Sequence, residues 1–407
     1  MVLNLVKFSH IADCHIGGWR DPKLKQINTD AFFKAIDISL NEKVDFILIA
    51  GDLFNTALPG IDRLKDVVRK FKELKDKNVP VYLIPGSHDY SPSGKTMLDV
   101  LEEAGLCINV VKGDVVNKKL RLRFTIDKKT GAKITGLLGR RGMLEKSYYE
   151  ELDREHLEKE SGFKIFMFHT ALTELKPKKL EKMESAPISL LPKGFDYYAG
   201  GHVHIVEKKD LPGYKNVVYP GPLFPNTFYE LEELEGGGFY IYDDGNINRI
   251  NLQVKNVFTI NVNANHKIPE SVTSEIIEQI QNKEFNDTIV LIRVRGTLES
   301  GKMSEIDFKK IYDLLNEKSA YFIMRNTAQL STKEFEEIKV ETSSIEEIED
   351  KLIEEHLGQI ESGWDKEKEK IMSKSLMTIL SSDKKEGEKV YEYEARIKDE
   401  IERLLNI

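Results

Sequence analysis

Carboxylate and imidazole side chains recur in five short motifs along the first half of the chain. In order, the motifs are Asp13-Cys14-His15, Gly51-Asp52, Gly86-Ser87-His88-Asp89, His169 and Gly201-His202-Val203-His204. Mixed carboxylate and imidazole ligation suits manganese or iron, whereas a shell made only of oxygen atoms would suit magnesium. Two such metals, roughly 3.5–4 Å apart, make a nucleophile from water and neutralise phosphoryl oxygens. The chemistry indicated is therefore phosphoester hydrolysis.

Each motif follows an apolar run that predicts a β-strand. These runs are Leu5–Ile11, Phe46–Ala50, Val81–Ile84, Phe163–Phe168 and Tyr197–Ala199. Because groups at strand ends converge on one crevice in a layered α/β sheet, we expect the five motifs to line one site. Taken singly, each has an ordinary explanation as a turn or a buried histidine. Their order and their common position at strand ends favour the metal site.

The spacing within the motifs indicates how the ligands divide between two metals. Asp52, at the end of an apolar run, is the natural bridging carboxylate. Asp13 and His15 are one residue apart, so both can face one metal from an extended or turning segment. His202 and His204 have the same spacing. We expect His10, beside the first motif, to be a buried hydrogen-bonding residue rather than a ligand.

Strands alternate with amphipathic helices through the first 245 residues, a pattern typical of an α/β sheet with helices on both faces. Later strands, including Phe239–Tyr242, lie closer together and predict a second, mixed or antiparallel sheet. We expect a smaller α/β cap at 255–330, which alternates strand and helix, ends in a strand at Tyr321–Met324 and has no catalytic residues. The predicted units are 1–250, the cap at 255–330, a charged linker at 331–365 and a helical segment at 366–407.

The C-terminal part differs sharply in charge from the rest of the chain. From residue 333 to 407 it holds 22 acidic and 13 basic residues, a net charge of −9, whereas residues 1–332 hold 46 and 47, a net of +1. Because the distribution of charge over the surface matters more than the net charge, a near-neutral body is compatible with a basic, DNA-facing groove. After residue 366, two apolar clusters on helical patterns are separated by a predicted break at Glu386-Gly387. They indicate either a solvated tail or a helix pair that docks in a partner's groove.

Length, apolar content and cysteine content narrow the class of protein. The chain has 407 residues, 40% of them hydrophobic, which is enough for two or three domains with real cores. No apolar run is long enough to cross a bilayer, and no secretion signal is evident at the N-terminus. The only cysteines, Cys14 and Cys107, fit neither a disulfide framework nor a zinc site. We expect a cytoplasmic, nucleoid-associated protein.

The order of the five motifs resembles that of the calcineurin-like metallophosphoesterases. Within this superfamily, FSHIADCHIGGW and IAGDLFN, together with the cap and the charged helical tail, resemble the DNA double-strand-break repair nucleases of the meiotic recombination eleven and SbcD type. The resemblance is most specific over residues 8–20, 47–55, 84–90 and 200–204, and it implies an archaeal source. It also implies a four-layer, two-sheet sandwich with helices on both outer faces.

The resemblance implies a role for each motif residue. One manganese ion would be held by Asp13, His15, Asp52 and His204, and the other by Asp52, Ser87, His169 and His202. His88 would not be a ligand. It would face the scissile phosphate and either stabilise the developing charge or protonate the leaving oxygen. Asp89 would orient His88 or close the turn, and we favour the turn.

The resemblance also implies partners. It predicts a homodimer formed through the nuclease domain, single- and double-stranded DNA ends as substrate, and an SMC-like coiled-coil ATPase bound by the C-terminal helices. The function implied is an endonuclease and 3'-5' exonuclease that depends on two Mn²⁺ ions, with Mg²⁺ or Fe²⁺ as substitutes. Leu53, Phe54, Leu58 and residues 98–106 would be either apolar interface or core.

Two positions depart from the family pattern. Ser87 replaces the family's metal-binding asparagine, and Asn55 replaces a histidine that is common three residues after the bridging aspartate. A hydroxyl is a poorer metal donor than an amide oxygen, so we expect weaker occupancy of the second metal position. Because Asn55 lacks the imidazole of that histidine, we expect lower exonuclease efficiency. Two alternatives therefore remain, namely a general phosphodiesterase or phosphatase, and a tethering scaffold with a weakened metal site.

Overall fold

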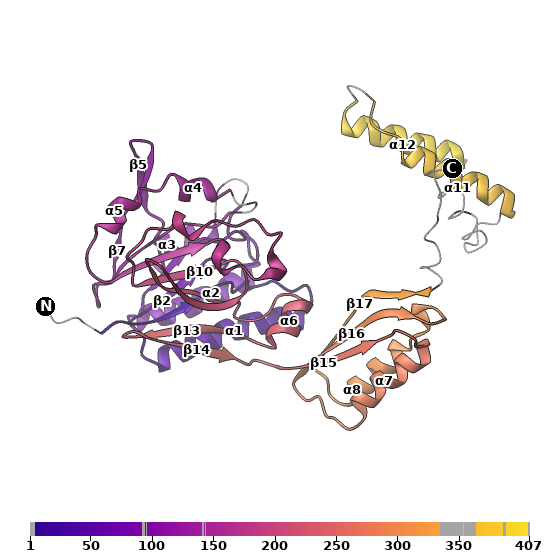
Figure 1. Cartoon of the computed structure of the whole chain (residues 1–407), viewed down its shortest axis with the longest axis horizontal. Coiled ribbons are helices and arrows are strands. Elements are labelled where there is room, and N and C mark those ends of the chain that lie inside the picture. The colour runs from indigo at the N-terminus through magenta and orange to yellow at the C-terminus, as the bar shows by residue number, and fades with distance from the viewer. Residues whose placement is uncertain are drawn as a thin grey trace.

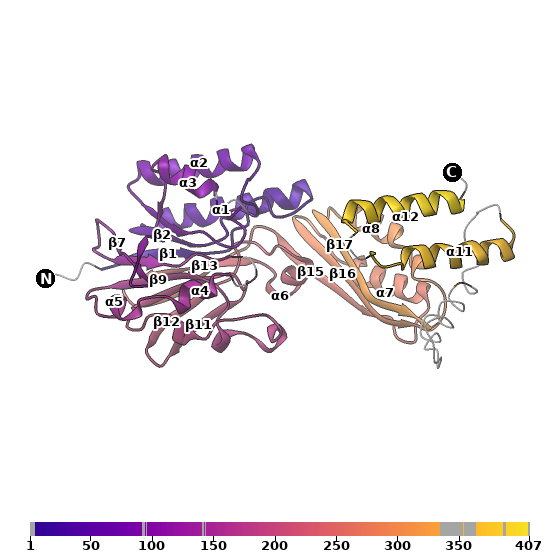
Figure 2. The ribbon, with the colours of Figure 1, turned by 90° about the horizontal axis from the view of Figure 1, so that it is seen from above.

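The structure is a computed structural model that describes residues 5–333 except 92, 93, 95, 141 and 143, residue 353, and residues 364–405 except 386 and 387. Figures 1 and 2 show a body of stacked sheets and helices, followed by a smaller unit and two long C-terminal helices. The predicted break at Glu386-Gly387 and most of the predicted 331–365 linker lie outside the described residues.

The first sheet is central to the body and has six strands in the spatial order β14-β13-β1-β2-β3-β4. β1, β2, β3 and β4 run parallel, whereas β13 lies antiparallel to β1. The bounds are β1 Lys7–Ile11, β2 Phe46–Ala50, β3 Val81–Ile84, β4 Ile108–Asn109, β13 Gly237–Asp243 and β14 Asn246–Leu252. All five residues of β2 are buried, as expected for an inner parallel strand covered on both faces.

The second sheet also has six strands, in the order β11-β12-β10-β9-β8-β7. Its four inner strands are parallel and its two edge strands are antiparallel. The bounds are β7 Thr125–Ile126, β8 Lys133–Gly136, β9 Lys164–His169, β10 Tyr197–Gly201, β11 Val206–Leu211 and β12 Tyr214–Pro220. A separate two-stranded ribbon is formed by β5 Gly113–Val116 and β6 Lys119–Leu122.

Apolar side chains from both sheets meet between them. The ring of Phe8 in β1 stacks on Phe46 and meets the edge of Tyr197 in the second sheet, with centroid distances of 5.1 and 5.0 Å. Figure 2 shows helices α1 Pro22–Asn41, α2 Ile61–Asp76 and α3 Met97–Glu103 over the first sheet. Helices α4 Lys146–Glu150 and α5 Arg154–Glu158 belong to the half of the body built around the second sheet. The predicted α/β class and the C-terminal helices are confirmed.

The structure corrects the predicted position of the strand at Phe239–Tyr242. This segment, β13, belongs to the first sheet, because it pairs antiparallel with β1 in the register Phe8↔Tyr242. The rings of these two residues stack with centroids 4.8 Å apart. A strand's partner depends on contacts more than two hundred residues away in the sequence, which local spacing does not encode.

The smaller unit follows the predicted order of strand, helix, strand, helix and strand. It consists of β15 Asn256–Asn263, α7 Pro269–Gln281, β16 Thr288–Leu298, α8 Phe308–Glu317 and β17 Phe322–Thr332, and its three strands form an all-parallel sheet. The last strand was predicted to span Tyr321–Met324 and is much longer. Its C-terminal half is mostly polar, so it lacks the apolar signal on which that prediction relied.

The smaller unit contacts the body through apolar and ionic groups. Ile289 and Leu291 of β16 belong to the same buried cluster as α1 and α2. Arg293 donates from Nε and Nη2 to the Glu232 carboxylate of helix α6, Phe228–Leu234, at 2.6–3.0 Å. Because both side chains are mostly shielded from water, this bidentate ion pair holds α6 beside β16.

The C-terminal helices form an antiparallel pair. Helix α11, Lys366–Leu380, begins at Asp365, whose side chain accepts from the Lys368 amide, and α12 spans Val390–Leu405. Ile371 and Leu380 are 59% and 60% exposed, so the pair does not bury all of its own apolar side chains. In the described residues no helix is both long enough and apolar enough to cross a membrane.

Candidate metal centre

The five motifs meet at one edge of the body, where the parallel strands of both sheets end. The loop after β1 is held to the loop after β2, because the Asp13 amide donates to the Gly51 carbonyl at 3.2 Å and the His15 amide to the Asp52 carbonyl at 2.9 Å. The second sheet joins through Asp13, whose carboxylate accepts from the His202 amide at 2.9 Å. Three of the motifs are thereby linked around one point.

Backbone strain is concentrated in these loops. Five of the predicted ligands are non-glycine residues with positive φ, namely Asp13 (50°), His15 (44°), Asp52 (52°), His202 (102°) and His204 (51°). Each such residue costs on the order of 1–3 kcal/mol and persists where its surroundings fix it. These left-handed residues lie in the loops after β1, β2 and β10.

Two glycines allow the loops to approach one another. A Cβ atom at Gly51 would lie 2.1 Å from His169 Nδ1, and one at Gly86 would lie 2.2 Å from Asp52 Oδ1. Both distances are far below van der Waals contact. The glycines beside the ligands are therefore required by packing, and Gly51 also adopts a φ of +87°.

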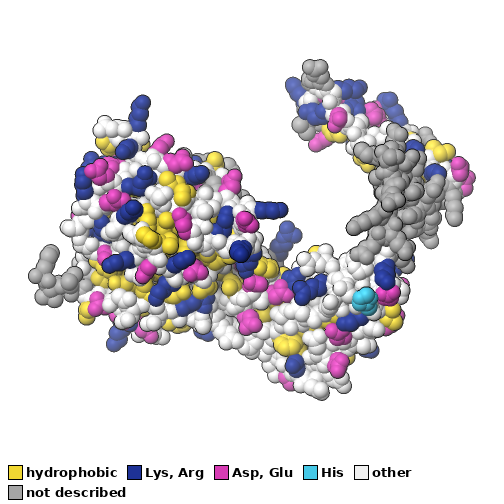
Figure 3. All heavy atoms as spheres, viewed as in Figure 1, with side chains coloured by type: hydrophobic (Ala, Val, Ile, Leu, Met, Phe, Trp, Pro, Cys, Tyr) yellow, Lys and Arg dark blue, Asp and Glu magenta, His cyan; other side chains and the backbone are white. Residues whose placement is uncertain are grey.

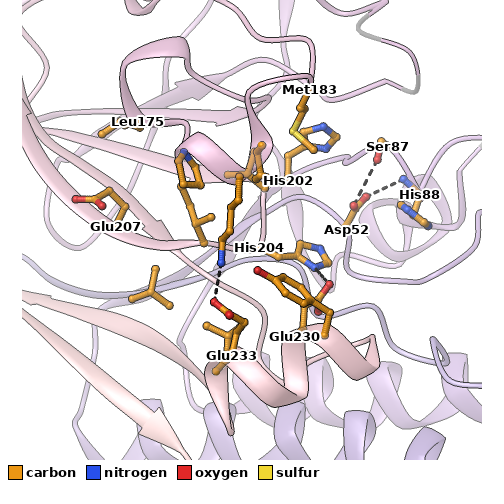
Figure 4. Close-up of a pocket in the computed structure, with 18 residues that line it drawn as sticks. Asp52, Ser87, His88, Leu175, Met183, His202, His204, Glu207, Glu230 and Glu233 are labelled. Carbon is orange, nitrogen blue, oxygen red and sulfur yellow. Dashed lines mark hydrogen bonds and ion pairs between the residues drawn. The ribbon is translucent and has the colours of Figure 1, made fainter. Parts of the chain in front are cut away.

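One group of ligand atoms consists of Asp13, His15 and His204, which lie within 4.8 Å of one another. His204 Nδ1 is hydrogen-bonded to the Glu230 carboxylate at 3.1 Å, so Nδ1 carries the proton and Nε2 faces the site (Figure 4). This Nε2 is 2.9 Å from His15 Nε2. Two imidazole nitrogens at that distance require a shared proton or a cation beside them.

A second group consists of Asp13, Asp52 and His169. His169 Nδ1 donates to the Ala50 carbonyl at 2.8 Å, which leaves Nε2 toward the site. That atom is buried, lies 3.2 Å from Asp52 Oδ2 and has no hydrogen-bond partner among the described residues. An orphaned nitrogen next to a carboxylate is the arrangement that a metal ion satisfies. The donor set therefore fits divalent cations.

The remaining predicted ligands also lie at this edge. Ser87 Oγ is 3.5 Å from Asp52 Oδ2 (Figure 4), the oxygen that also lies 3.2 Å from His169 Nε2. The ring of His202 meets that of His169 with centroids 5.1 Å apart. All seven residues predicted as ligands are therefore brought together, although His202 and Ser87 fall outside the tight ligand groups.

Burial and mutual charge set the pKa values of the acidic and basic groups. Burial raises the pKa of Asp13. Burial would also raise that of Asp52, but the imidazoles of His169 and His15 outweigh it and hold the pKa well below its usual range. Burial would lower the pKa of His169 and His204, but Asp52 raises the first to about 10 and Glu230 raises the second to about 9. Without metal, the Asp52 and Glu230 carboxylates therefore favour the protonated forms of these two imidazoles.

His88 is oriented by main-chain groups. Its Nδ1 donates to the Asn55 carbonyl at 2.9 Å, and its own amide donates to Asp52 Oδ1 at 2.7 Å (Figure 4). Nε2 is left as the available atom, on the same side as His15, whose ring centroid is 4.8 Å away. Asn55, a departure from the family pattern, thus contributes its carbonyl to the orientation of His88.

Asp89 closes the turn, as favoured from the sequence. Its carboxylate accepts from the amides of Leu53, Phe54 and Gly86 at 2.9–3.3 Å. His10 is also as expected, because it is fully buried and its Nδ1 lies 3.0 Å from the Tyr197 hydroxyl. Neither side chain is among the close ligand groups found in the described residues.

A cavity of about 550 Å³ opens beside the metal ligands. Asp52, Ser87, His88, His202 and His204 line its inner end. Its outer walls come from the 175–183 loop and from α6, and their apolar members are Leu175, Leu180, Met183, Tyr229 and Leu234 (Figure 4). The cavity therefore has a polar inner end, next to the candidate metal ligands, and largely apolar outer walls.

Sequence reasoning missed the groups that hold the ligands in place. These are the Glu230 carboxylate, the Asn226 and Asn28 amides, and the carbonyls of Ala50 and Asn55. The two carbonyls carry no residue-type signal. Glu230 lies 26 residues beyond His204 and outside every motif, and its spacing from Thr227 suggests only a helix cap.

Comparison with known proteins bears on the identity of this site. Residues 6–206 match the family model described as calcineurin-like phosphoesterase, and this stretch contains every predicted ligand. The chain belongs to the calcineurin-like phosphoesterases. As a member of this family with these ligand groups, it is a metal-dependent phosphodiester hydrolase.

Three relatives share the description "DNA double-strand break repair protein Mre11". The protein of Sulfolobus acidocaldarius is 27% identical over 96% of this chain and 99% of its own length. That of Archaeoglobus fulgidus is 26% identical over 88% and 82%, and that of Sulfurisphaera tokodaii is 30% identical over 63% and 65%. The similarity therefore extends past the phosphoesterase region into the cap and the C-terminal helices.

Proposed function

We propose that this chain is a Mn²⁺-dependent DNA nuclease, with endonuclease and 3'-5' exonuclease activity, that processes double-strand breaks in the cytoplasm with an SMC-like ATPase. The observation that carries the proposal is the convergence of the seven predicted ligands at one edge, with the free Nε2 of His88 beside them. Similarity to Mre11 proteins over almost the whole chain supports DNA as the substrate.

We assign two ion positions on either side of Asp52. Asp13, His15 and His204 would hold one ion, and Ser87, His169 and His202 would hold the other, with the Asp52 carboxylate shared between them. Three close groups of ligand atoms bear on this division: Asp13, His15 and His204 match the first set, whereas Asp52 lies with His169 and Asp13 in one group and with His15 and His88 in another, as a shared carboxylate would. When bound, the ions supply a water-derived nucleophile at neutral pH and neutralise the phosphoryl oxygens.

The chain's own residues supply the rest of the chemistry. His88, fixed by Asn55 through Nδ1, presents Nε2 to the scissile phosphate, where it donates a hydrogen bond to the developing charge or a proton to the leaving oxygen. The apolar walls of the cavity suit a nucleobase next to the scissile phosphate better than they suit a second phosphate. Of the acids that line this cavity, Glu207 adds a negative charge, whereas Glu233 is paired with Lys179 at 2.7 Å.

Two surfaces support the proposed assembly. Leu58, Ile61 and Val100 lie at or near α2 and α3 and are 76%, 84% and 56% exposed, which suits a homodimer contact. Leu53 and Phe54, which the sequence left open, are core residues at 1% exposure. The exposed apolar side chains of α11 suit docking of the helical pair on a partner's coiled coil. On the face drawn in Figure 3, lysine and arginine side chains are interspersed with acidic ones.

A cleavage assay with Mn²⁺ separates the candidate functions. Wild type, His88→Ser and Asp52→Ala are compared on linear DNA and on a small phosphodiester such as bis(p-nitrophenyl) phosphate. DNA cleavage that is lost in both variants supports the proposal. Hydrolysis confined to the small ester would instead favour a general phosphodiesterase, and an inactive wild type that still binds DNA would favour the tethering scaffold.

Truncation tests the proposed partner contact. A chain ending near Lys333 retains every ligand and the three-stranded cap, so we expect nuclease activity close to wild type. We also expect it to lose co-purification with the ATPase, because α11 and α12 are removed. Co-purification that survives the truncation would contradict this assignment.

A further inference from the structure

Glu230 links the two segments that hold one of the two ion positions. Its Oε1 accepts from His204 Nδ1 at 3.1 Å, and its Oε2 accepts from the Asn226 amide at 2.8 Å. The side chain is 17% exposed and that of His204 is 20% exposed. Both carboxylate oxygens are thus engaged close to the site, where water weakens the contacts little.

The contacts continue from Glu230 to the loop that carries Asp13 and His15. The Asn226 side-chain oxygen accepts from Asn28 Nδ2 at 2.9 Å, and the same nitrogen lies 3.4 and 3.3 Å from the carbonyls of Cys14 and His15. Trp19 Nε1 adds a bond to the Pro225 carbonyl at 3.0 Å. The 225–230 segment is therefore fixed to the loop after β1 and to the loop after β10.

An ordinary structural role for Glu230 would be helix capping. Thr227 is the N-cap of α6 and Glu230 is three residues later, which is the spacing of a capping box. In that motif the glutamate side chain returns to the N-cap amide. Here it bonds the preceding residue's amide and the imidazole of His204 instead, so capping does not account for its position.

We propose that Glu230 is the positioning residue for the ion held by Asp13, His15 and His204. It fixes the His204 ring with Nε2 toward the site and raises the basicity of that nitrogen as a ligand. Through Asn226 and Asn28 it also holds the loop of the other two ligands at the right separation. Carboxylates placed behind a metal-binding imidazole typically change metal affinity by about 10–100-fold. The other ion position has no such carboxylate behind its imidazoles among the described residues.

This inference rests on the proposed two-metal function, and it is tested on the full chain by stepwise Mn²⁺ binding. Free Mn²⁺ is followed by electron paramagnetic resonance for wild type, Glu230→Gln and Glu230→Ala. The Gln variant keeps an oxygen acceptor and the size of the side chain, whereas the Ala variant removes both. Glu235→Gln, an exposed change of the same charge directly after α6, is the matched control.

The expected result is that one of the two ions binds roughly 10–100-fold more weakly in Glu230→Ala, with a smaller loss in Glu230→Gln and none in the control. At intermediate Mn²⁺ the Ala variant should show the signal of a single uncoupled ion, where wild type shows a coupled pair. Unchanged melting temperatures of the metal-free variants would separate positioning from a folding defect.

The possible failures are distinguishable. A wild type that binds fewer than two Mn²⁺ ions would overturn the two-metal function itself. A wild type that binds two ions, with equal affinities in wild type and Glu230→Ala, would overturn the role of Glu230 and leave the function standing. Equal weakening of both ions in the Ala variant would also contradict the proposal, because Glu230 contacts only one side of the site.

Discussion

The two sides of the proposed metal centre are supported in different ways. Around Asp13, His15 and His204, side chains from outside the motifs form a continuous chain of hydrogen bonds that runs through Glu230, Asn226 and Asn28. Around His169 the support is main chain, because its Nδ1 donates to the Ala50 carbonyl and the Gly51 backbone packs against its ring.

The difference extends to the ligands. The His204 imidazole is hydrogen-bonded to a carboxylate through the nitrogen that points away from the site. The His202 imidazole, by contrast, has no hydrogen-bond partner in the described part of the chain. Ser87 offers only a hydroxyl, 3.5 Å from Asp52. One side is therefore organised before the ion arrives, and the other relies on the ion to order it. We infer that the Asp13 side fills first and binds more tightly. The following predictions test that asymmetry.

The largest effect is expected at Asp52, the group that the two sides share. Asp52→Ala removes a carboxylate that contacts His169, Ser87 and the His88 amide, so both ions should bind weakly and cleavage should fall to background. Asp37→Ala, an exposed change on α1, is the control. Metal content after dialysis and DNA cleavage measure the effect. A variant that keeps two tightly bound ions would contradict a bridging role.

Replacing His88 should lower the turnover rate without changing Mn²⁺ binding at either ion position. Because its Nε2 faces the substrate position and Nδ1 is bonded to Asn55, His88→Gln should lower kcat about 10²–10⁴-fold with little change in Mn²⁺ affinity. His266→Gln, at an exposed histidine of the cap, is the matched control. Weaker metal binding in His88→Gln, with kcat intact in the bound state, would show that His88 acts as a ligand instead.

Metal binding should strengthen steeply as the pH rises. Without metal the pKa of His169 is raised to about 10 and that of His204 to about 9, so both rings are protonated at pH 7. An ion takes the neutral ring, and each displaced proton adds about tenfold in affinity per pH unit. Between pH 6 and 8 we expect the affinity for each ion to rise about tenfold per pH unit, or about 100-fold for the two ions taken together. Calorimetry in two buffers of different ionisation enthalpy should show about two protons released, and none released would refute it.

The smallest effect is expected from strengthening the second side. Ser87→Asn supplies an amide oxygen where only a hydroxyl stands, so the weaker Mn²⁺ ion should bind about tenfold more tightly, or about 1.4 kcal/mol, while the tighter ion is unchanged. Stepwise titration of both proteins provides the measurement. Equal affinities in wild type and variant would mean that water or another group completes that shell.

The sequence was sufficient to predict which side chains meet at this edge, because their residue types are rare and they follow strand ends. Asp13, Asp52 and His169 each follow a buried strand, and the structure brings them within 4.8 Å. The supporting groups were not predictable in the same way. Ala50 and Asn55 act through carbonyls that every residue has, and Glu230 reaches His204 only because α6 folds back over the loop after β10.

For the fold too, features with a local sequence signal were predictable and features set by distant contacts were not. Continuous apolar runs such as Phe46–Ala50 predicted buried parallel strands correctly, since burial on both faces leaves a strong local signal. The partner of β13 and the polar end of β17 were missed. In both cases the decisive contacts are between strands, β13 with β1 and β17 with β16, and alternation along a single strand does not specify them.

Diffraction from crystals soaked in Mn²⁺, recorded at the manganese absorption edge, tests the shared carboxylate most directly. We expect two anomalous peaks roughly 3.5–4 Å apart on either side of Asp52, with the peak next to Asp13, His15 and His204 the stronger at limiting Mn²⁺. A single peak at saturating Mn²⁺, or peaks away from Asp52, would contradict the account.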